Sequence, residues 1–237
     1  MDPKNVKNLE LLMKIATLCN DAALVYPVRK KETLNNNGNP RLSNGVNEKN
    51  NYKIAGDPTE GALVVASRKY NPDEKFFERG ERKIDENPFE SDRMMMSVIY
   101  QRDRTVDKEE SGLSSYIKGS PDMLLALSPK KLTEKGIVPF SDAEKSKIKK
   151  IYDAMSGEAL RVLAFAYRPV RKNFSNGIKP ANTKISIDEA EKDLIWVGMM
   201  AMIDPPRRDV GDAIAECHES GIKVIMITGD YEITAEA

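Results

Sequence analysis

The clearest strand signals in the chain lie close together in Met94–Gly119, MMMSVIYQRDRTVDKEESGLSSYIKG. The runs Met94–Gln101 and Ser114–Lys118 are rich in residues that favour strands, and a mostly charged loop separates them. Antiparallel strands need only a direct connection of this kind, whereas parallel strands need a crossover. The sequence therefore predicts a long antiparallel hairpin.

Two helices are predicted before this hairpin. Residues 6–25 place leucine, methionine and alanine at mostly helical spacing, which indicates an amphipathic helix with a frayed end at Asn20-Asp21. The second helix begins after Asp57, a capping residue that is followed by Pro58 at the first helical position, and it continues to Tyr70. Glu60 lies three residues after the cap, so a capping box explains its place in the sequence.

Helices and strands alternate after the hairpin. Ser120 and Pro121 repeat the chemistry of a helix start, and a third amphipathic helix is predicted over residues 141–159. Strands are predicted over residues 160–170 and 193–203. Two polar insertions, near residues 27–51 and 171–186, have the composition of mobile surface loops.

Pro205-Pro206 marks the predicted domain boundary, because two consecutive prolines cannot continue a strand ladder or a helix interior. Residues 1–203 would form one domain and residues 204–237 the start of another. A helix over residues 208–221 and a buried parallel strand over Ile222–Asp230 are expected there. This order is typical of half a βαβ unit, in which ligands bind at the carboxyl ends of the strands.

The composition excludes several functional classes. Lys+Arg and Asp+Glu number 37 each, so no overall field favours nucleic acid or an anionic membrane. Cys19 and Cys217 lie in apolar helical patterns without metal-ligand spacing, which favours buried, reduced thiols. With His218 as the only histidine, a Ser/His or His-rich metal mechanism lacks its parts. Neither a membrane-spanning run nor a signal peptide is evident.

Six short motifs occur in one order, with helices and strands between them: GDPTEGAL, FESDRMMMS, KGSPD, LRVLAFA, MIDPPR and TGD. Together they resemble the cytoplasmic ATP-binding loop of a P-type ATPase, specifically a type II cation pump. LCNDAAL near the start is similar to the calcium-pump branch. The resemblance covers nearly the whole chain, from about Leu9 to Ala237.

The resemblance implies an α/β fold, in which a nucleotide-binding domain with an antiparallel sheet flanked by helices is inserted into a Rossmann-like phosphorylation domain. Residues 204–237 would be the hinge and the beginning of that second domain. It further implies that the chain is an excised piece. The aspartyl-phosphate motif Asp-Lys-Thr-Gly-Thr would lie upstream, the magnesium-binding acids downstream and the transmembrane helices elsewhere.

As such a piece, the chain would be a soluble, monomeric part of the cytoplasmic head of an integral membrane protein, without a catalytic residue of its own. Its partners would be nucleotide and the remaining domains and transmembrane helices of the pump. Its cofactors would be ATP and Mg²⁺. The transported ion stays open, with calcium favoured by resemblance over sodium, protons or another cation.

The resemblance also implies an adenine pocket. Phe89 matches the aromatic residue on which adenine stacks, although a lone phenylalanine at a strand start is more often a core residue. Lys118, followed by Gly119, matches a lysine that lines the pocket near the phosphates, whereas a solitary lysine is more often solvated. Glu60 matches an acid that accepts a hydrogen bond from the adenine amino group, and this role competes with the capping box.

Further residues are expected at the phosphates. Arg161 matches an arginine that reaches them, against the alternative of a surface arginine. Asp204 and Arg207 resemble the hinge pair over the triphosphate, and a rigid turn is compatible with the same residues. Thr228, Gly229 and Asp230 match a strand-end motif that faces the phosphoryl group and Mg²⁺. No metal ligand is assigned.

Two positions depart from the calcium-pump pattern. Ser91 and Met94 stand where pumps of the reticulum type carry an arginine and a lysine. Losing two positive charges weakens phosphate attraction unless Arg93 substitutes for them. This leaves a second hypothesis, a degenerate interaction or regulatory module that no longer holds ATP. A soluble phosphatase of the related hydrolase fold is a third, and the missing phosphorylation motif argues against it.

Overall fold

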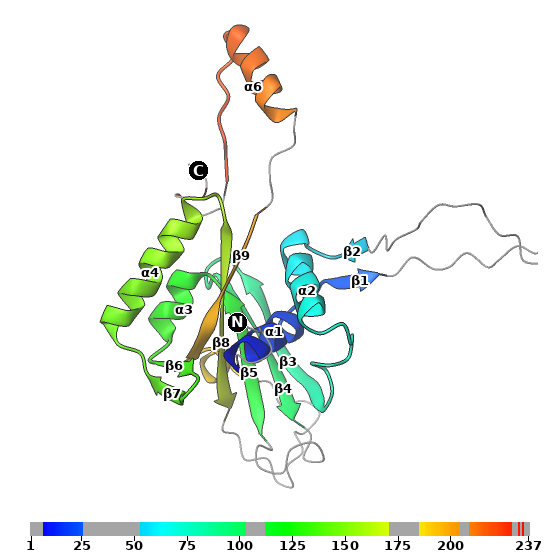
Figure 1. The fold of residues 1–237 in the computed structure, drawn as a ribbon, viewed down its shortest axis with the longest axis vertical. Coiled ribbons are helices and arrows are strands. Elements are labelled where there is room, and N and C mark those ends of the chain that lie inside the picture. The colour runs from blue at the N-terminus through cyan, green and yellow to red at the C-terminus, as the bar shows by residue number, and fades with distance from the viewer. Residues whose placement is uncertain are drawn as a thin grey trace, which may run out of the picture.

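The computed structural model describes residues 7–25, 53–102, 112–170, 185–203 and 209–228, together with positions 232 and 234. In these ranges the body is a seven-stranded sheet with the order β3-β4-β5-β8-β9-β6-β7, and a separate two-stranded ribbon, β1-β2, lies beside it (Figure 1). The strands are β1 Ala23–Val25, β2 Lys53–Ala55, β3 Glu81–Glu90, β4 Met95–Arg102, β5 Leu113–Gly119, β6 Lys130–Thr133, β7 Gly136–Pro139, β8 Arg161–Val170 and β9 Ile195–Met202. The helices are α1 Lys7–Leu18, α2 Pro58–Tyr70, α3 Pro121–Leu127, α4 Asp142–Ser156, α5 Ile187–Ala190 and α6 Val210–Glu219.

The predicted hairpin is confirmed, and its strands are the second and third of the sheet. β4 and β5 pair antiparallel, from Met95 opposite Gly119 to Gln101 opposite Leu113. β3, β8 and β9 continue the antiparallel pattern on either side, and only β6 joins β9 in parallel within the described sheet. The mixed α/β fold class, with a large sheet flanked by helices, is therefore as predicted.

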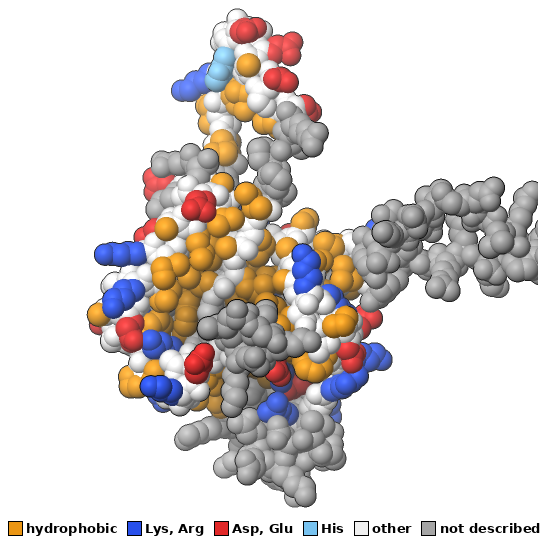
Figure 2. Space-filling model, viewed as in Figure 1, with side chains coloured by type: hydrophobic (Ala, Val, Ile, Leu, Met, Phe, Trp, Pro, Cys, Tyr) orange, Lys and Arg blue, Asp and Glu red, His pale blue; other side chains and the backbone are white. Residues whose placement is uncertain are grey.

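Strand alternation divides the core into two layers. On one face Met96, Tyr116 and Phe165 pack with the buried side of α1 and with Leu63 of α2. On the opposite face Ile117 and its neighbours pack with α3 and with residues that flank α4. Figure 2 shows apolar side chains gathered over the sheet between α4 and α1, with charged side chains toward the outer surfaces.

Two local features have clear causes. α1 ends at Leu18, close to the frayed end expected at Asn20-Asp21, and the Asn20 side chain accepts a hydrogen bond from the Ala22 N–H where the chain turns into β1. β3 was not predicted, since ERKIDENPFE is charged and lacks apolar alternation. It lies at an edge of the sheet, where charged strands are common.

The predicted buried strand after α6 is wrong for the described residues 222–228. This segment has no regular secondary structure, and the exposure of its apolar side chains reaches 94% at Ile227. α6 and this segment extend away from the sheet in Figure 1. A buried strand needs a neighbouring strand to pair with, and none of the described strands lies beside it. The proposed boundary at Pro205-Pro206 lies outside the described residues.

None of the helices in the described ranges combines the length and apolar character that crossing a bilayer requires.

Candidate functional site

Lys118 and Arg161 lie on one face and at one end of the sheet. Lys118 pairs with Phe165 across β5 and β8, on the face that α1 and α2 cover. Arg161, the first residue of β8, lies four residues before Phe165, so alternation places it on the same face. β5 ends at Gly119 opposite Ala164, which leaves Arg161 beyond the end of that strand. The register thus places two predicted site residues on the same face toward the same end of the sheet.

Glu60 joins them from the first turn of α2. Its carboxylate pairs with the Lys118 ammonium at 2.5 Å and also accepts a hydrogen bond from the Asp21 N–H at 3.0 Å. The Lys118 side chain is only 7% exposed and the Glu60 side chain 18%. Of the two predicted orientations of Glu60, the structure therefore has the one that faces the sheet. Asp57 caps the helix instead, accepting from the Thr59 N–H at 2.8 Å and the Glu60 N–H at 3.3 Å.

Cys19 is buried near this pair. Its thiol donates to the Met96 carbonyl at 3.5 Å. Burial raises the pKa of Cys19 to about 12, and the nearby Lys118 charge offsets only part of that effect. The predicted buried, reduced thiol is confirmed for Cys19, while Cys217 is half-exposed.

Arg161 is linked to the start of α2. Its guanidinium donates to the Thr59 hydroxyl oxygen at 3.1 Å. Partial burial raises the pKa of Asp57, but hydrogen bonds from Thr59 and Glu60 and the charge of Arg161 outweigh that effect and hold the pKa below its ordinary value. The helix start, an ionised cap and an arginine thus form one polar rim next to Lys118.

Phe89 lies on β3 with 58% of its surface exposed, so the core-residue alternative does not hold. The next residue, Glu90, pairs with Met95, which belongs to the α3 side of the sheet. A register shift between Asn87 and Glu90 interrupts the alternation at Phe89, so neither neighbour fixes the face of its ring. The exposed ring lies on β3, at the same end of the sheet as Gly119, because Glu90 pairs with Met95 and Met95 pairs with Gly119.

Gly119 has a structural reason to be glycine. A Cβ at this position would lie 2.6 Å from the Met94 carbonyl oxygen and 2.6 Å from the Met95 Cβ. The close neighbour of its backbone is the chain at the start of β4. Met94 itself has a positive φ of 51° and is exposed, so its side chain leaves the sheet at the turn between β3 and β4.

Arg93 does not join this group. Its guanidinium pairs with Glu191 at 2.5 Å and with Glu90 at 3.0 Å, on the α5 side of the sheet. Burial lowers the pKa of Arg93, but these two carboxylates outweigh that effect and raise it above its ordinary value. Glu191 was missed in the sequence, where an acid just before an apolar strand gives no sign of its partner.

The remaining predicted residues are not placed beside this group. Asp204, Arg207, Gly229 and Asp230 lie outside the described residues. Thr228 is described, and it is exposed at the end of the segment that follows α6. Among the described side chains, no group of three His, Cys, Asp or Glu residues is arranged to hold a metal ion.

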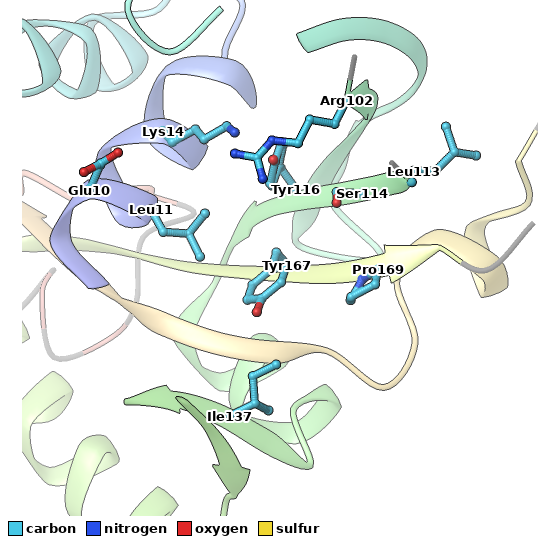
Figure 3. A pocket seen from close by; sticks show the side chains of 11 residues that line it. Glu10, Leu11, Lys14, Arg102, Leu113, Ser114, Tyr116, Ile137, Tyr167 and Pro169 are labelled. Carbon is cyan, nitrogen blue, oxygen red and sulfur yellow. The ribbon is translucent and has the colours of Figure 1, made fainter. Parts of the chain in front are cut away.

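A cavity of about 680 Å³ lies toward the other end of the same face, between the first turns of α1 and the strands β5 and β8 (Figure 3). Lys14, Arg102, Tyr116 and Tyr167 are among its lining residues. Both cations are directed to one buried carboxylate, Glu81, at 2.5 Å from Lys14 and 3.6 Å from Arg102. The cavity therefore lies apart from Glu60, Lys118 and Arg161, none of which lines it.

Comparison with known proteins identifies the family to which this fold belongs. Residues 8–209 match the family model described as P-type ATPase, cytoplasmic domain N. The chain belongs to the P-type ATPase family.

Its relatives include the calcium-transporting ATPase of Bacillus subtilis (strain 168), 39% identical over 186 residues, which are 78% of this chain and 19% of the relative. Calcium-transporting ATPase 1 of Lactococcus lactis is 37% identical over 185 residues, 78% of this chain and 19% of that protein. The sodium/potassium-transporting ATPase subunit alpha-2 of Gallus gallus is 34% identical over 185 residues, 77% of this chain and 18% of the subunit. The matched part thus spans about a fifth of each relative's length.

Proposed function

We propose that the chain is the nucleotide-binding portion of a P-type ATPase that couples ATP hydrolysis to cation transport, with calcium as the favoured ion. The observation that carries the proposal is the position of Glu60, Lys118 and Arg161 on one face at one end of the sheet, with the exposed ring of Phe89 on β3 at the same end. Family membership and the names of the bacterial relatives support it.

Each side chain has a role that its chemistry permits. The Phe89 ring would stack on adenine, which stabilises binding by ~1–3 kcal/mol for a base on an aromatic ring. A carboxylate has acceptor sites for more than one donor, so Glu60 would accept from the adenine amino group while keeping Lys118. Lys118, beside Gly119, would lie nearer the phosphates, and Arg161 at the rim would contact them.

The chemistry would be completed by the rest of the pump. An aspartate outside this chain would attack the γ-phosphate and form an aspartyl phosphate. Mg²⁺ would neutralise the phosphate charge. Asp204, Arg207, Thr228, Gly229 and Asp230 would close the site at the hinge of residues 204–237, a role for which family resemblance is the support. The chain would form part of the pump's cytoplasmic head and, alone, bind nucleotide as a monomer without hydrolysing it.

The test is an NMR titration of amide shifts with ATP and with AMP, each with and without Mg²⁺. We expect saturable binding in the micromolar to millimolar range, and Phe89→Ala should weaken it about 10-fold without unfolding the protein. Ile137→Ala, which removes an exposed apolar side chain from β7 at the far edge of the sheet, is the matched control. Trp196 fluorescence is a poor reporter, because that indole is buried against Phe140 on the opposite face.

A second candidate is favoured by Ser91, Met94 and the direction of Arg93. The two positions carry no positive charge, and Arg93 is bound to carboxylates instead of facing Lys118. These features suit a degenerate module that binds a regulator instead of nucleotide. A folded wild-type protein that shows no shift changes at several millimolar ATP would favour this candidate.

A further inference from the structure

The Phe89 side chain has little packing against the rest of the protein, because 58% of the residue is exposed. The strand pairing between β3 and β4 is irregular just before it, with a register shift between Asn87 and Glu90. A bulge of this kind bends a strand and re-aims its side chains. The direction of the ring must therefore be set by what holds the neighbouring residues.

Arg93 holds both neighbours of Phe89. One terminal nitrogen donates to the Pro88 carbonyl at 2.7 Å, and Nε donates to the Glu90 carboxylate at 3.0 Å. The other terminal nitrogen donates to Glu191 at 2.5 Å. The planar guanidinium thus spans the turn with donors in fixed directions, which a lysine could not do.

Glu191 connects these hydrogen bonds of Arg93 to the rest of the fold. Its side chain is 5% exposed, and it lies in the connection between α5 and β9. The same carboxylate oxygen accepts from the Ser97 hydroxyl at 2.8 Å, and Ser97 in turn accepts from Asn87 at 2.9 Å. The bulge is therefore tied at both ends to one buried acid.

We propose that Arg93, anchored by Glu191, is a positioning residue that holds Phe89 in the direction needed to stack on a nucleobase. This inference rests on the proposed function of the site. It differs from the sequence-based hypothesis, in which Arg93 would replace the missing positive charges and contact phosphate. Binding of AMP and ATP distinguishes the two roles, because the two nucleotides share the base and differ in phosphate charge.

The experiment is a double-mutant cycle on the whole chain, with Arg93→Met, Phe89→Ala and the double variant titrated with AMP and ATP. We expect Arg93→Met to weaken both ligands by ~3–10-fold and to add less than ~2-fold once Phe89 is gone, because residues that act as a unit are not additive. Arg93→Lys should retain part of the affinity. Arg168→Met is the control, since Arg168 donates to the Asp188 carbonyl of α5 but lies away from the turn.

A loss that persists undiminished in the Phe89→Ala background would overturn the proposal, and so would a loss confined to ATP. A second readout needs no nucleotide: ¹⁵N relaxation at the Phe89 and Glu90 amides, where order parameters should fall from ~0.85 toward ~0.6 in the Arg93 variants. If wild type bound no nucleotide, the proposed function would fail, whereas unchanged relaxation would overturn the positioning role itself. If Arg93→Met does not fold, Arg93→Lys carries both measurements.

Discussion

Two ion pairs lie at the same end of the sheet on opposite faces, and they differ in how completely their partners are used. Glu60–Lys118 and Arg93–Glu191 each have a closest approach of 2.5 Å, and each contains one nearly buried side chain, Lys118 at 7% and Glu191 at 5% exposure. Arg93 donates from all of its guanidinium nitrogens, and Glu191 has a further donor in Ser97. The outer members of the two pairs are similarly exposed, Glu60 at 18% and Arg93 at 16%, so the pairs differ in the use of their donors.

The comparison separates a structural charge pair from one that can serve a ligand. Exchanging partners within the Arg93 network would leave a buried carboxylate unsatisfied, which is costly in a low-dielectric interior. The Glu60–Lys118 pair can add a ligand at modest cost, because the Lys118 ammonium has three donors and its side-chain hydrogen bond among the described residues is the one to Glu60. Substitutions at the two pairs should therefore rank in opposite order for stability and for nucleotide affinity.

The largest expected effect is on stability, at Arg93. Arg93→Met removes one partner of a buried pair and leaves Glu191 uncompensated, which costs about 3–5 kcal/mol in comparable cases. Urea unfolding at pH 7 would show this as a lower midpoint. Arg93→Met combined with Glu191→Leu should recover part of the loss, because an apolar pair avoids the buried charge. A loss below about 1 kcal/mol in the single variant would remove the distinction between the two pairs.

The next effect is on affinity, at Lys118. Lys118→Met should weaken ATP binding about 10-fold or more, equivalent to about 1.4 kcal/mol. Its cost in stability should be smaller, about 1–2 kcal/mol, since Glu60 keeps the Asp21 N–H and some solvent. Titration and urea unfolding on the same preparation would test both. If Lys118→Met proved more destabilising than Arg93→Met while leaving affinity intact, the assignment of the two pairs would be reversed.

The sequence singled out both members of one pair, Glu60 and Lys118, through the family resemblance, whereas Glu191 of the other pair was missed. The strands β4, β5 and β8 follow from local patterns, and antiparallel pairing then places Lys118 and Arg161 on one face. The Arg93–Glu191 contact joins residues 98 positions apart, and the local sequence around each residue does not predict the other as its partner. Register between neighbouring strands can be inferred from alternation, whereas a contact between a turn and a distant connection depends on the complete packing.

The error after α6 has the same origin. Val224–Ile227 has the apolar, β-branched composition of a buried strand, yet these side chains are exposed in the structure. Composition states that a segment is suited to pairing, and it does not state that a partner is present. The charged β3 is the converse case, because it pairs with β4 despite an unfavourable composition. In both cases the outcome depended on whether another strand lies alongside the segment, and a single sequence does not show which segments lie side by side.

The smallest expected effect concerns the polar rim on the ligand side, where charges near solvent should contribute little to stability. The pKa of Asp57 is held below its ordinary value in the folded protein, so its ionised form stabilises the fold. That contribution is complete at pH values above the ordinary carboxyl range and is lost as the pH falls through the lowered pKa. Asp57→Asn keeps a capping side chain without the charge and should cost only about 0.5 kcal/mol at pH 7.

Urea unfolding of wild type and Asp57→Asn at pH 7, 5, 4 and 3 would test the sign. The difference between them should be constant from pH 7 to 5 and shrink below pH 4, because the folded state then binds the proton that the unfolded state already carries. Asp92→Asn, at an exposed position in the turn before β4, controls for a general change in net charge. If the difference in unfolding free energy grew on acidification, the surroundings of Asp57 would destabilise its ionised form. The favourable interaction between Asp57 and Arg161 would then be contradicted.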